Sequence, residues 1–163
     1  MPRASAHGLA VRFVGPDGQL CERMREALGR HDCCHHVCMR RRTLLLVADD
    51  YEDSAELLAE LLALELGCNT IAVKDGAQAL AVALDRKPLA ALLDIDMPRM
   101  QGTEVALKIR EQTGQSILLV AVSGGVDLAS LRRLRLFDLV FQKPLTDEDR
   151  AQIRQQIDAR LEG

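Results

Sequence analysis

The sequence predicts a doubly wound α/β domain, a five-stranded parallel sheet with helices on both faces. Two observations lead to this prediction. Five short apolar runs alternate with longer segments whose apolar residues recur every three to four positions. Short apolar runs are typical of parallel strands buried on both faces, and a single helix between successive strands implies right-handed crossovers. The sheet is therefore expected inside two layers of helices.

The strand–helix alternation begins at Thr43 and continues to the end of the chain. Strands are predicted at residues 43–48, 70–73, 89–93, 117–122 and 139–141. Helices are predicted at residues 52–66, 77–84, 104–111, 128–136 and 147–161. Gly67 follows the first helix as a typical stop signal, and Pro88 follows the second. The expected strand order is 2-1-3-4-5.

Composition narrows the function classes. Hydrophobic residues make up 48% of the chain and the formal net charge is −3, so nothing favours wholesale nucleic-acid binding. No apolar stretch reaches the roughly 18 residues of a membrane span, and no secretory signal precedes the domain. We therefore predict a cytoplasmic protein with no direct DNA binding and no membrane association.

Residues 1–38 differ from the rest of the chain. They hold four of the five cysteines and all four histidines, several of them clustered between His31 and Cys38. A structural zinc site needs a second ligand group at a distance, which this chain lacks, so a zinc site is disfavoured. We predict that residues 1–38 are a disordered extension or precede the true initiator, Met39, and that residues 39–163 form the domain.

Polar residues stand at the ends of four apolar runs. Asp49 and Asp50 follow the first, Asp94 the third, Ser123 the fourth and Lys143 the fifth. Ligand sites in parallel sheets form outside the carboxyl ends of the strands, so these side chains are expected to meet. Three neighbouring carboxylates repel one another unless a cation lies among them. Mg2+ suits such a cluster, because it prefers oxygen ligands.

A carboxylate next to bound Mg2+ can attack phosphorus and become an aspartyl phosphate. Phosphoryl transfer requires mainly positioning and positive charge, which the metal, Lys143 and the Ser123 hydroxyl can supply. Asp94 is the natural acceptor, because its strand lies between those of Asp50 and Ser123 in the expected order. Singly, each residue could instead be a helix cap, a turn residue or a solvated charge.

Residues 43–145 resemble the receiver domain of two-component response regulators. Four motifs carry the resemblance: Ala48-Asp49-Asp50-Tyr51-Glu52, the stretch from Leu92 to Gly102 around Asp94 and Pro98, Ser123-Gly124, and Lys143-Pro144. The resemblance implies a flavodoxin-like sheet order and phosphorylation of Asp94 by a histidine kinase or histidine phosphotransferase. It also implies a cis peptide bond before Pro144.

The same resemblance implies the metal ligands. Asp50, Asp94 and the backbone carbonyl of Asp96 would hold Mg2+, with Asp49 reaching it through water. It further implies a regulator rather than an enzyme, with at most self-phosphorylation and self-dephosphorylation. Nothing follows the last helix in this chain. We therefore expect a stand-alone receiver that signals by protein–protein contact, with residues 128–145 as the surface for a downstream target.

Two positions depart from the family pattern. Val140 stands where an aromatic residue is usual, and Phe141 beside it is expected to face the other side of the sheet. This places the family's aromatic switch in doubt. Asp96 adds a carboxylate near the phosphorylation site, and we predict that it alters the lifetime of the phosphorylated state.

Two other functions use the same residues. Asp94 and Asp96 also match the DxD of haloacid-dehalogenase-like phosphatases, although the acidic pair of that family follows the lysine, whereas here it comes first. A degenerate receiver, which keeps the fold as a binding module without phosphorylation, is the milder alternative.

Overall fold

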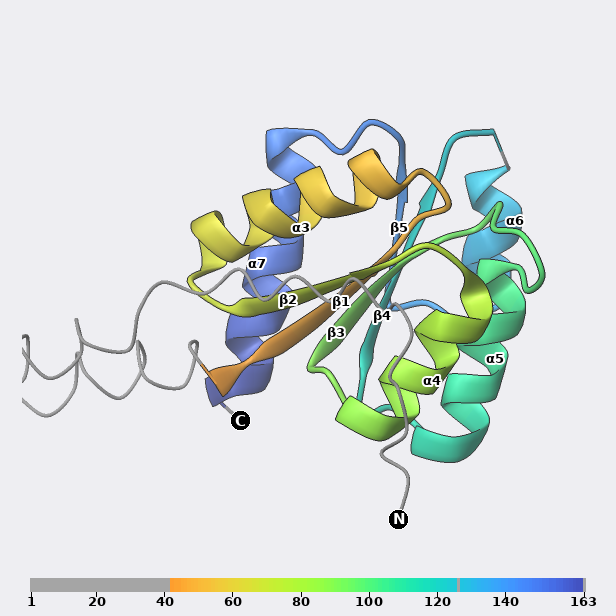
Figure 1. The fold of residues 1–163 in the computed structure, drawn as a ribbon, viewed down its shortest axis with the longest axis horizontal. Coiled ribbons are helices and arrows are strands. Elements are labelled where there is room, and N and C mark those ends of the chain that lie inside the picture. Colours follow the sequence, from red (N-terminus) through yellow and green to blue (C-terminus); the bar gives the residue numbers. More distant parts are fainter. Residues whose placement is uncertain (1–41, 126, 163) are drawn as a thin grey trace, which may run out of the picture.

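The computed structural model describes residues 42–125 and 127–162, which form one parallel sheet enclosed by helices (Figure 1). The strands are β1 (Leu44–Ala48), β2 (Asn69–Val73), β3 (Ala90–Asp94), β4 (Leu118–Ser123) and β5 (Leu139–Gln142). The helices are α3 (Glu52–Leu66), α4 (Gly76–Arg86), α5 (Gly102–Thr113), α6 (Leu128–Arg133) and α7 (Asp147–Glu162). The strand order is β2-β1-β3-β4-β5, which confirms the predicted topology.

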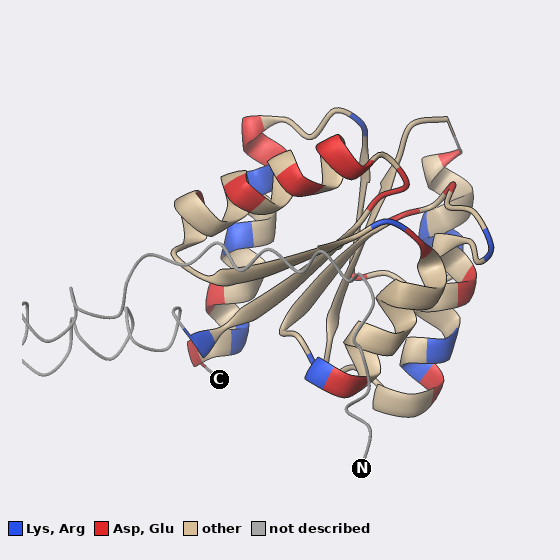
Figure 2. Ribbon diagram, in the orientation of Figure 1, with Lys and Arg blue, Asp and Glu red and all other residues tan. Residues whose placement is uncertain are grey.

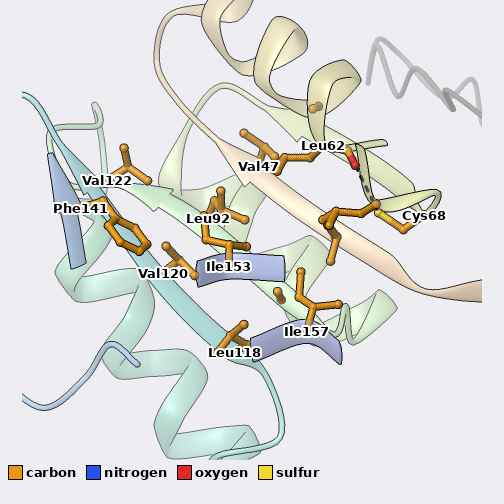
Figure 3. Packing of buried hydrophobic residues seen from close by; sticks show 14 of the residues in the cluster. Val47, Leu62, Cys68, Leu92, Leu118, Val120, Val122, Phe141, Ile153 and Ile157 are labelled. Carbon is orange, nitrogen blue, oxygen red and sulfur yellow. Dashed lines mark hydrogen bonds between the residues drawn. The ribbon is translucent and has the colours of Figure 1, made fainter. Parts of the chain in front are cut away.

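Alternate residues of each strand face opposite helical layers. Val47, Leu92 and Val120 lie in one buried cluster with residues of α3 and α7. Leu46 and Leu119 lie in a second cluster with α4 and α5, and α6 packs on that same side. Figure 3 shows the first cluster, in which isoleucines of α7 lie against the central strands. Both faces of the sheet are therefore buried, as continuous apolar strands require.

The element boundaries follow local chemistry. Helix α3 spans the predicted residues, and Gly67 ends it with a left-handed φ of 64°. Helix α4 begins earlier than predicted, because the Asp75 carboxylate accepts a hydrogen bond from the Gln78 backbone N–H at 2.8 Å and caps it. The prediction of a helix over 128–136 was too long, since α6 ends at Arg133 and Arg135 has a left-handed φ of 52°.

At the amino-terminal end of the sheet, the guanidinium of Arg110 in α5 forms hydrogen bonds to the chain segments that precede β4 and β5. Its Nε donates to the Leu136 carbonyl at 2.9 Å, and Nη1 donates to the carbonyls of Ile117 and Gly114 at 2.9 and 3.1 Å. Nη2 pairs with Asp138 at 2.7 Å. Every contact joins segments distant from the site described below, so we assign this network to stability.

Among the described residues, no helix is long and apolar enough to cross a membrane. The prediction for residues 1–38 lies outside the part of the chain that the structure describes.

Candidate functional site

The carboxyl ends of the strands form an open acidic hollow. Asp49 and Asp50 lie in the turn between β1 and α3, Asp94 is the last residue of β3, and Lys143 follows β5. The hollow is lined by Asp49, Asp50, Tyr51, Asp53, Ser54, Asp94, Asp96, Gly124 and Lys143. The structure thus brings together five of the residues that the sequence singled out, namely Asp49, Asp50, Asp94, Asp96 and Lys143. Ser123 ends β4 but is fully buried and does not line the hollow.

Lys143 joins the two buried carboxylates of the site. Its ammonium donates to Asp49 Oδ2 at 2.6 Å and to Asp94 Oδ2 at 2.7 Å. Asp49 and Asp94 are only 4% and 5% exposed, so neither could be left ionised without a nearby cation. Burial acts to lower the pKa of Lys143, but the hydrogen bonds and negative charges of Asp49 and Asp94 outweigh it and raise that pKa. The ammonium therefore stays charged at neutral pH.

Backbone and hydroxyl donors fix the two carboxylates further. Asp49 Oδ1 accepts a hydrogen bond from the Tyr51 N–H at 3.0 Å, and its Oδ2 accepts one from the Ser54 hydroxyl at 3.4 Å. Asp94 Oδ1 accepts one from the Asp96 N–H at 3.2 Å. Asp94 is thus held by β3 itself and by the loop that follows it.

Asp50 differs from its neighbours, because it is exposed and Lys143 does not contact it. Partial burial raises the pKa of its carboxyl, and the negative charges of Asp94 and Asp49 raise it further. Carboxylate oxygens of Asp49, Asp50 and Asp94 all lie within 4.8 Å of one another. An oxygen-only donor set with excess negative charge fits a hard divalent cation such as Mg2+.

The loop after β3 is tightly constrained at Gly102. A Cβ added there would lie 2.2 Å from the Asp94 carbonyl oxygen, so only glycine fits. The Gly102 N–H also donates to the Ile95 carbonyl at 3.0 Å. This contact fixes the distance from Asp94 to the start of α5. The peptide bond between Lys143 and Pro144 is cis, as the resemblance implied.

Val140 and Phe141 face opposite sides of the sheet, as expected. Phe141 lies in the cluster under α3 and α7, whereas Val140 lies with Ile95, Ala121 and Leu131. No aromatic ring therefore occupies the Val140 position on the α6 side of β5. The small cluster around Val140 links Ile95, the neighbour of Asp94, directly to α6.

The sequence analysis did not single out Tyr51, Asp53 or Ser54 as site residues. They line the hollow because Tyr51 directly follows the acidic pair and α3 begins at the next residue. The first turn of α3 therefore lies beside the site. The one available signal was their position immediately after Asp50. Asp96 lies where it was expected: its side chain is exposed in the hollow, and its backbone N–H donates to Asp94.

Fold and site together define a class of protein: a doubly wound α/β domain with an acidic pocket and a lysine at the carboxyl ends of its strands. The model of the response regulator receiver domain matches residues 45–156, and the chain belongs to this family.

Two solved structures illustrate the shared fold. A CheY-like receiver domain from Methanospirillum hungatei superposes with a TM-score of 0.65 at 22% identity, covering 74% of this chain and 98% of that one. A CheY-like receiver domain from Methylobacillus flagellatus gives a TM-score of 0.61 at 27% identity, covering 71% of this chain and 98% of that one.

Longer proteins are similar over part of their length. The DNA-binding response regulator MtrA of Mycolicibacterium smegmatis is 37% identical over 91 residues, which are 55% of this chain and 39% of MtrA. Protein-glutamate methylesterase/protein-glutamine glutaminase 2 of Anaeromyxobacter dehalogenans is 34% identical over 119 residues, 72% of this chain and 35% of that protein. The chain therefore spans well under half the length of these relatives.

MtrA is named as a DNA-binding protein, whereas we predicted no direct DNA binding for this chain. The relative thus lends that prediction no support. Because the chain spans 39% of MtrA, DNA binding is not carried over from it either. The absence of DNA binding stays a prediction.

Proposed function

We propose that this protein is a Mg2+-dependent phospho-acceptor of a two-component phosphorelay, phosphorylated on Asp94. The observation that carries the proposal is the placement of Asp94, which ends β3 with one carboxylate oxygen held by Lys143 and the other by the Asp96 N–H. Both partners are donors, so both carboxylate oxygens are held in a fixed orientation at the open edge of the sheet. These are the requirements of an oxygen nucleophile.

In the proposed transfer, an Asp94 oxygen forms a bond to phosphorus while the bond from phosphorus to the donor's leaving group breaks. With a phosphohistidine donor, the leaving imidazole nitrogen keeps the electron pair of the broken bond. Lys143 would contribute positive charge to the phosphoryl oxygens. Ser123 ends β4 but is buried in this structure, so its hydroxyl would have to turn toward the hollow to contact those oxygens. No proton has to leave Asp94, because it reacts as the carboxylate.

Asp50, Asp94 and the Asp96 carbonyl would hold Mg2+, and Asp49 would contact it through water. When bound, the ion supplies charge compensation for the carboxylates and for the incoming phosphoryl oxygens. The raised pKa of Asp50 supports this assignment, because after partial burial its causes are the negative charges of Asp94 and Asp49, which Lys143 offsets only in part.

The donor would be a histidine kinase or histidine phosphotransferase, and the protein would act in the cytoplasm. It would not be an enzyme beyond self-phosphorylation and self-dephosphorylation. Its output would be a changed affinity for a downstream protein at residues 128–145. The cluster that joins Ile95 to Leu131 and Val140 supports this route, because it runs from the neighbour of Asp94 to that surface.

The test is intact-mass spectrometry of the full chain after incubation with Mg2+ and acetyl phosphate. We expect the wild type to gain one phosphoryl group, and Asp94→Asn or omission of Mg2+ to abolish the gain. Asp85→Asn is the matched control, since Asp85 is exposed near the end of α4 and does not line the hollow. Phosphorylation of Asp94→Asn to the wild-type level would refute Asp94 as the acceptor.

The two alternatives give different results in the same assay. A degenerate receiver gains no phosphoryl group from acetyl phosphate or from a cognate kinase. A haloacid-dehalogenase-like phosphatase turns over a small phosphomonoester and loses that turnover in both Asp94→Asn and Asp96→Asn.

A further inference from the structure

Helix α3 exposes leucines on the face that points away from the sheet. Leu57, Leu61 and Leu64 follow one another at intervals of four and three residues, which places them in one stripe. Leu57 is 69% exposed and Leu64 is 80% exposed, while Leu61 is partly buried. The outer face of a surface helix normally carries polar residues, so this stripe is suited to contact another protein surface.

The helix that carries the stripe is acidic, although its Glu65 is paired with Arg150 of α7 at 3.1 Å. Helix α3 contains Glu52, Asp53, Glu56, Glu60 and Glu65 and no basic residue (Figure 2). Asp53 and Glu56 form no ion pair with any described residue. A surface that fits α3 must therefore combine apolar side chains with positive charge.

Such a surface exists elsewhere on the same molecule, at the exposed end of α6. Residues 128–136 contain three arginines and no acidic residue. Arg133 and Arg135 are exposed, and within the described ranges neither has an ion-pair partner. Leu134 between them is 52% exposed. The segment 133–135 thus presents an apolar side chain flanked by two cations.

The two surfaces cannot meet within one copy. Helix α3 packs with α7 on one face of the sheet, and α6 packs with Val140 and Ala121 on the other (Figure 1). Pairing α3 with a second α3 would oppose acidic residues, and pairing two α6 segments would oppose arginines. Charge therefore disfavours both symmetric contacts and favours a contact between unlike surfaces.

We propose that the α3 stripe of one copy binds residues 133–135 of a second copy, head to tail. A contact between unlike surfaces leaves one α3 and one α6 unused in every dimer, so it can continue into longer chains. Exposed charges at the border make the contact sensitive to salt. The proposal goes beyond phosphorylation and does not depend on it. The same arginines lie in the surface proposed for a downstream target, so the two contacts would compete.

The experiment is sedimentation velocity of the full chain over a range of concentrations, without Mg2+ or acetyl phosphate. We expect the sedimentation coefficient to rise with concentration and to fall back when salt is added. Two double variants each remove one of the two surfaces. Leu57→Lys with Leu64→Lys alters the α3 stripe, and Arg133→Glu with Arg135→Glu alters the segment at the end of α6. Each variant alone should sediment as a monomer at every concentration.

An equimolar mixture of the two variants is the decisive sample. One variant retains α3 and the other retains α6, so the mixture should form a heterodimer and nothing larger. Lys74→Glu with Lys87→Glu is the matched charge control, since both lysines are exposed and lie outside residues 128–136. Leu107→Lys is the control for an exposed leucine on another helix. Both controls should associate like the wild type, and far-UV circular dichroism should show that every variant is folded.

Three results would overturn the proposal: a wild type that stays monomeric at all concentrations, a surface variant that associates like the wild type, or a mixture that stays monomeric. Association that appears only when the chain begins at Met39 would also overturn it, because residues 1–38 would then be the occupant of the stripe. Since no phosphoryl donor is present, none of these results bears on Asp94.

Discussion

The two ends of the sheet use similar charged groups in opposite ways. At the amino-terminal end, one guanidinium serves four acceptors, and the Asp138 carboxylate also accepts a hydrogen bond from the Leu119 N–H at 2.7 Å. At the carboxyl end, one ammonium serves two buried carboxylates, and Asp50 has no contact with it. The first end leaves its charges satisfied, whereas the second keeps uncompensated negative charge beside an open hollow.

The two ends of the strands therefore have different roles: the amino-terminal end stabilises the fold, and the carboxyl end carries the candidate site. Groups with saturated hydrogen bonds resist change, and the network of Arg110 accordingly joins parts of the chain that have no role in the proposed chemistry. Groups with residual charge are available to a cation or a phosphoryl group, which is useful only where ligands can enter. The four predictions below test this division, in order of decreasing expected effect on free energy.

Arg110→Ala should destabilise the protein strongly without touching the site. It removes the side-chain donor of three carbonyls and one of the donors to the Asp138 carboxylate, and we expect the free energy of unfolding to fall by about 2–4 kcal/mol. Urea denaturation measures this change. Lys108→Ala on the same helix is the control, because it removes only the exposed Lys108–Glu104 pair and should cost at most about 0.5 kcal/mol. Equal effects of the two substitutions would contradict the structural role of Arg110.

Lys143→Met should destabilise the protein less, by about 1–2 kcal/mol, because the ammonium is partly exposed. The loss arises from repulsion between Asp49 and Asp94, so adding Asp94→Asn should restore much of it. The pKa of Lys143 is raised, so its contribution is fully present at neutral pH and is lost only as pH rises through that elevated value. The difference between wild type and variant should therefore stay constant from about pH 6 to 9, as followed by urea denaturation.

Asp96→Ala should change a rate rather than stability. The exposed Asp96 carboxylate lies in the hollow and can accept a proton from a water that attacks the phosphoryl group. We expect its removal to slow loss of the phosphoryl group by about two- to fivefold, with unfolding unchanged. Time-resolved intact-mass spectrometry after removal of acetyl phosphate measures the rate. Identical rates for wild type and variant would exclude a role for this carboxylate.

Asp50→Asn should have the smallest effect on the free energy of unfolding, and it should stabilise the protein rather than destabilise it. Because the pKa of Asp50 is raised in the folded state, its ionisation opposes folding above that pKa. In the absence of divalent cations, the variant should melt about 1–2 °C higher at pH 7, and the gain should vanish at low pH, where both states are protonated. Added Mg2+ should stabilise the wild type more than the variant. A variant that melts lower than the wild type at pH 7 would contradict the uncompensated charge.

The fold was largely predictable, because its main signals are local. Apolar runs, the spacing of leucines in α3 and the stop at Gly67 each depend on a few neighbouring residues. The errors fell where tertiary structure decides a boundary. Asp94 and Ser123 were expected just after their strands, yet both belong to them, because each still pairs with the neighbouring strand. The left-handed Arg135 that follows the end of α6 gave no sequence signal.

The meeting of the aspartates and Lys143 at one edge of the sheet was predictable, whereas Tyr51, Asp53 and Ser54 were missed and Ser123 does not line the hollow. The order of Asp50, Asp94 and Lys143 after separate strands is sufficient to place them at one edge. The sequence could not show that Lys143 bridges both buried carboxylates, since that depends on distances between separate loops. The bond from Arg110 to Asp138 spans 28 residues and follows no motif, so no pattern indicated it.

The close approach of Gly102 to the Asp94 carbonyl also limits how this lineage can diverge. Any heavier residue at that position collides with the main chain of the acceptor, so the loop between them can neither lose its glycine nor change its length freely. Asp96 and Pro98 between the two are exposed and carry no such restriction. The exposed loop positions can therefore vary, while the main chain at Asp94 keeps its place relative to the start of α5.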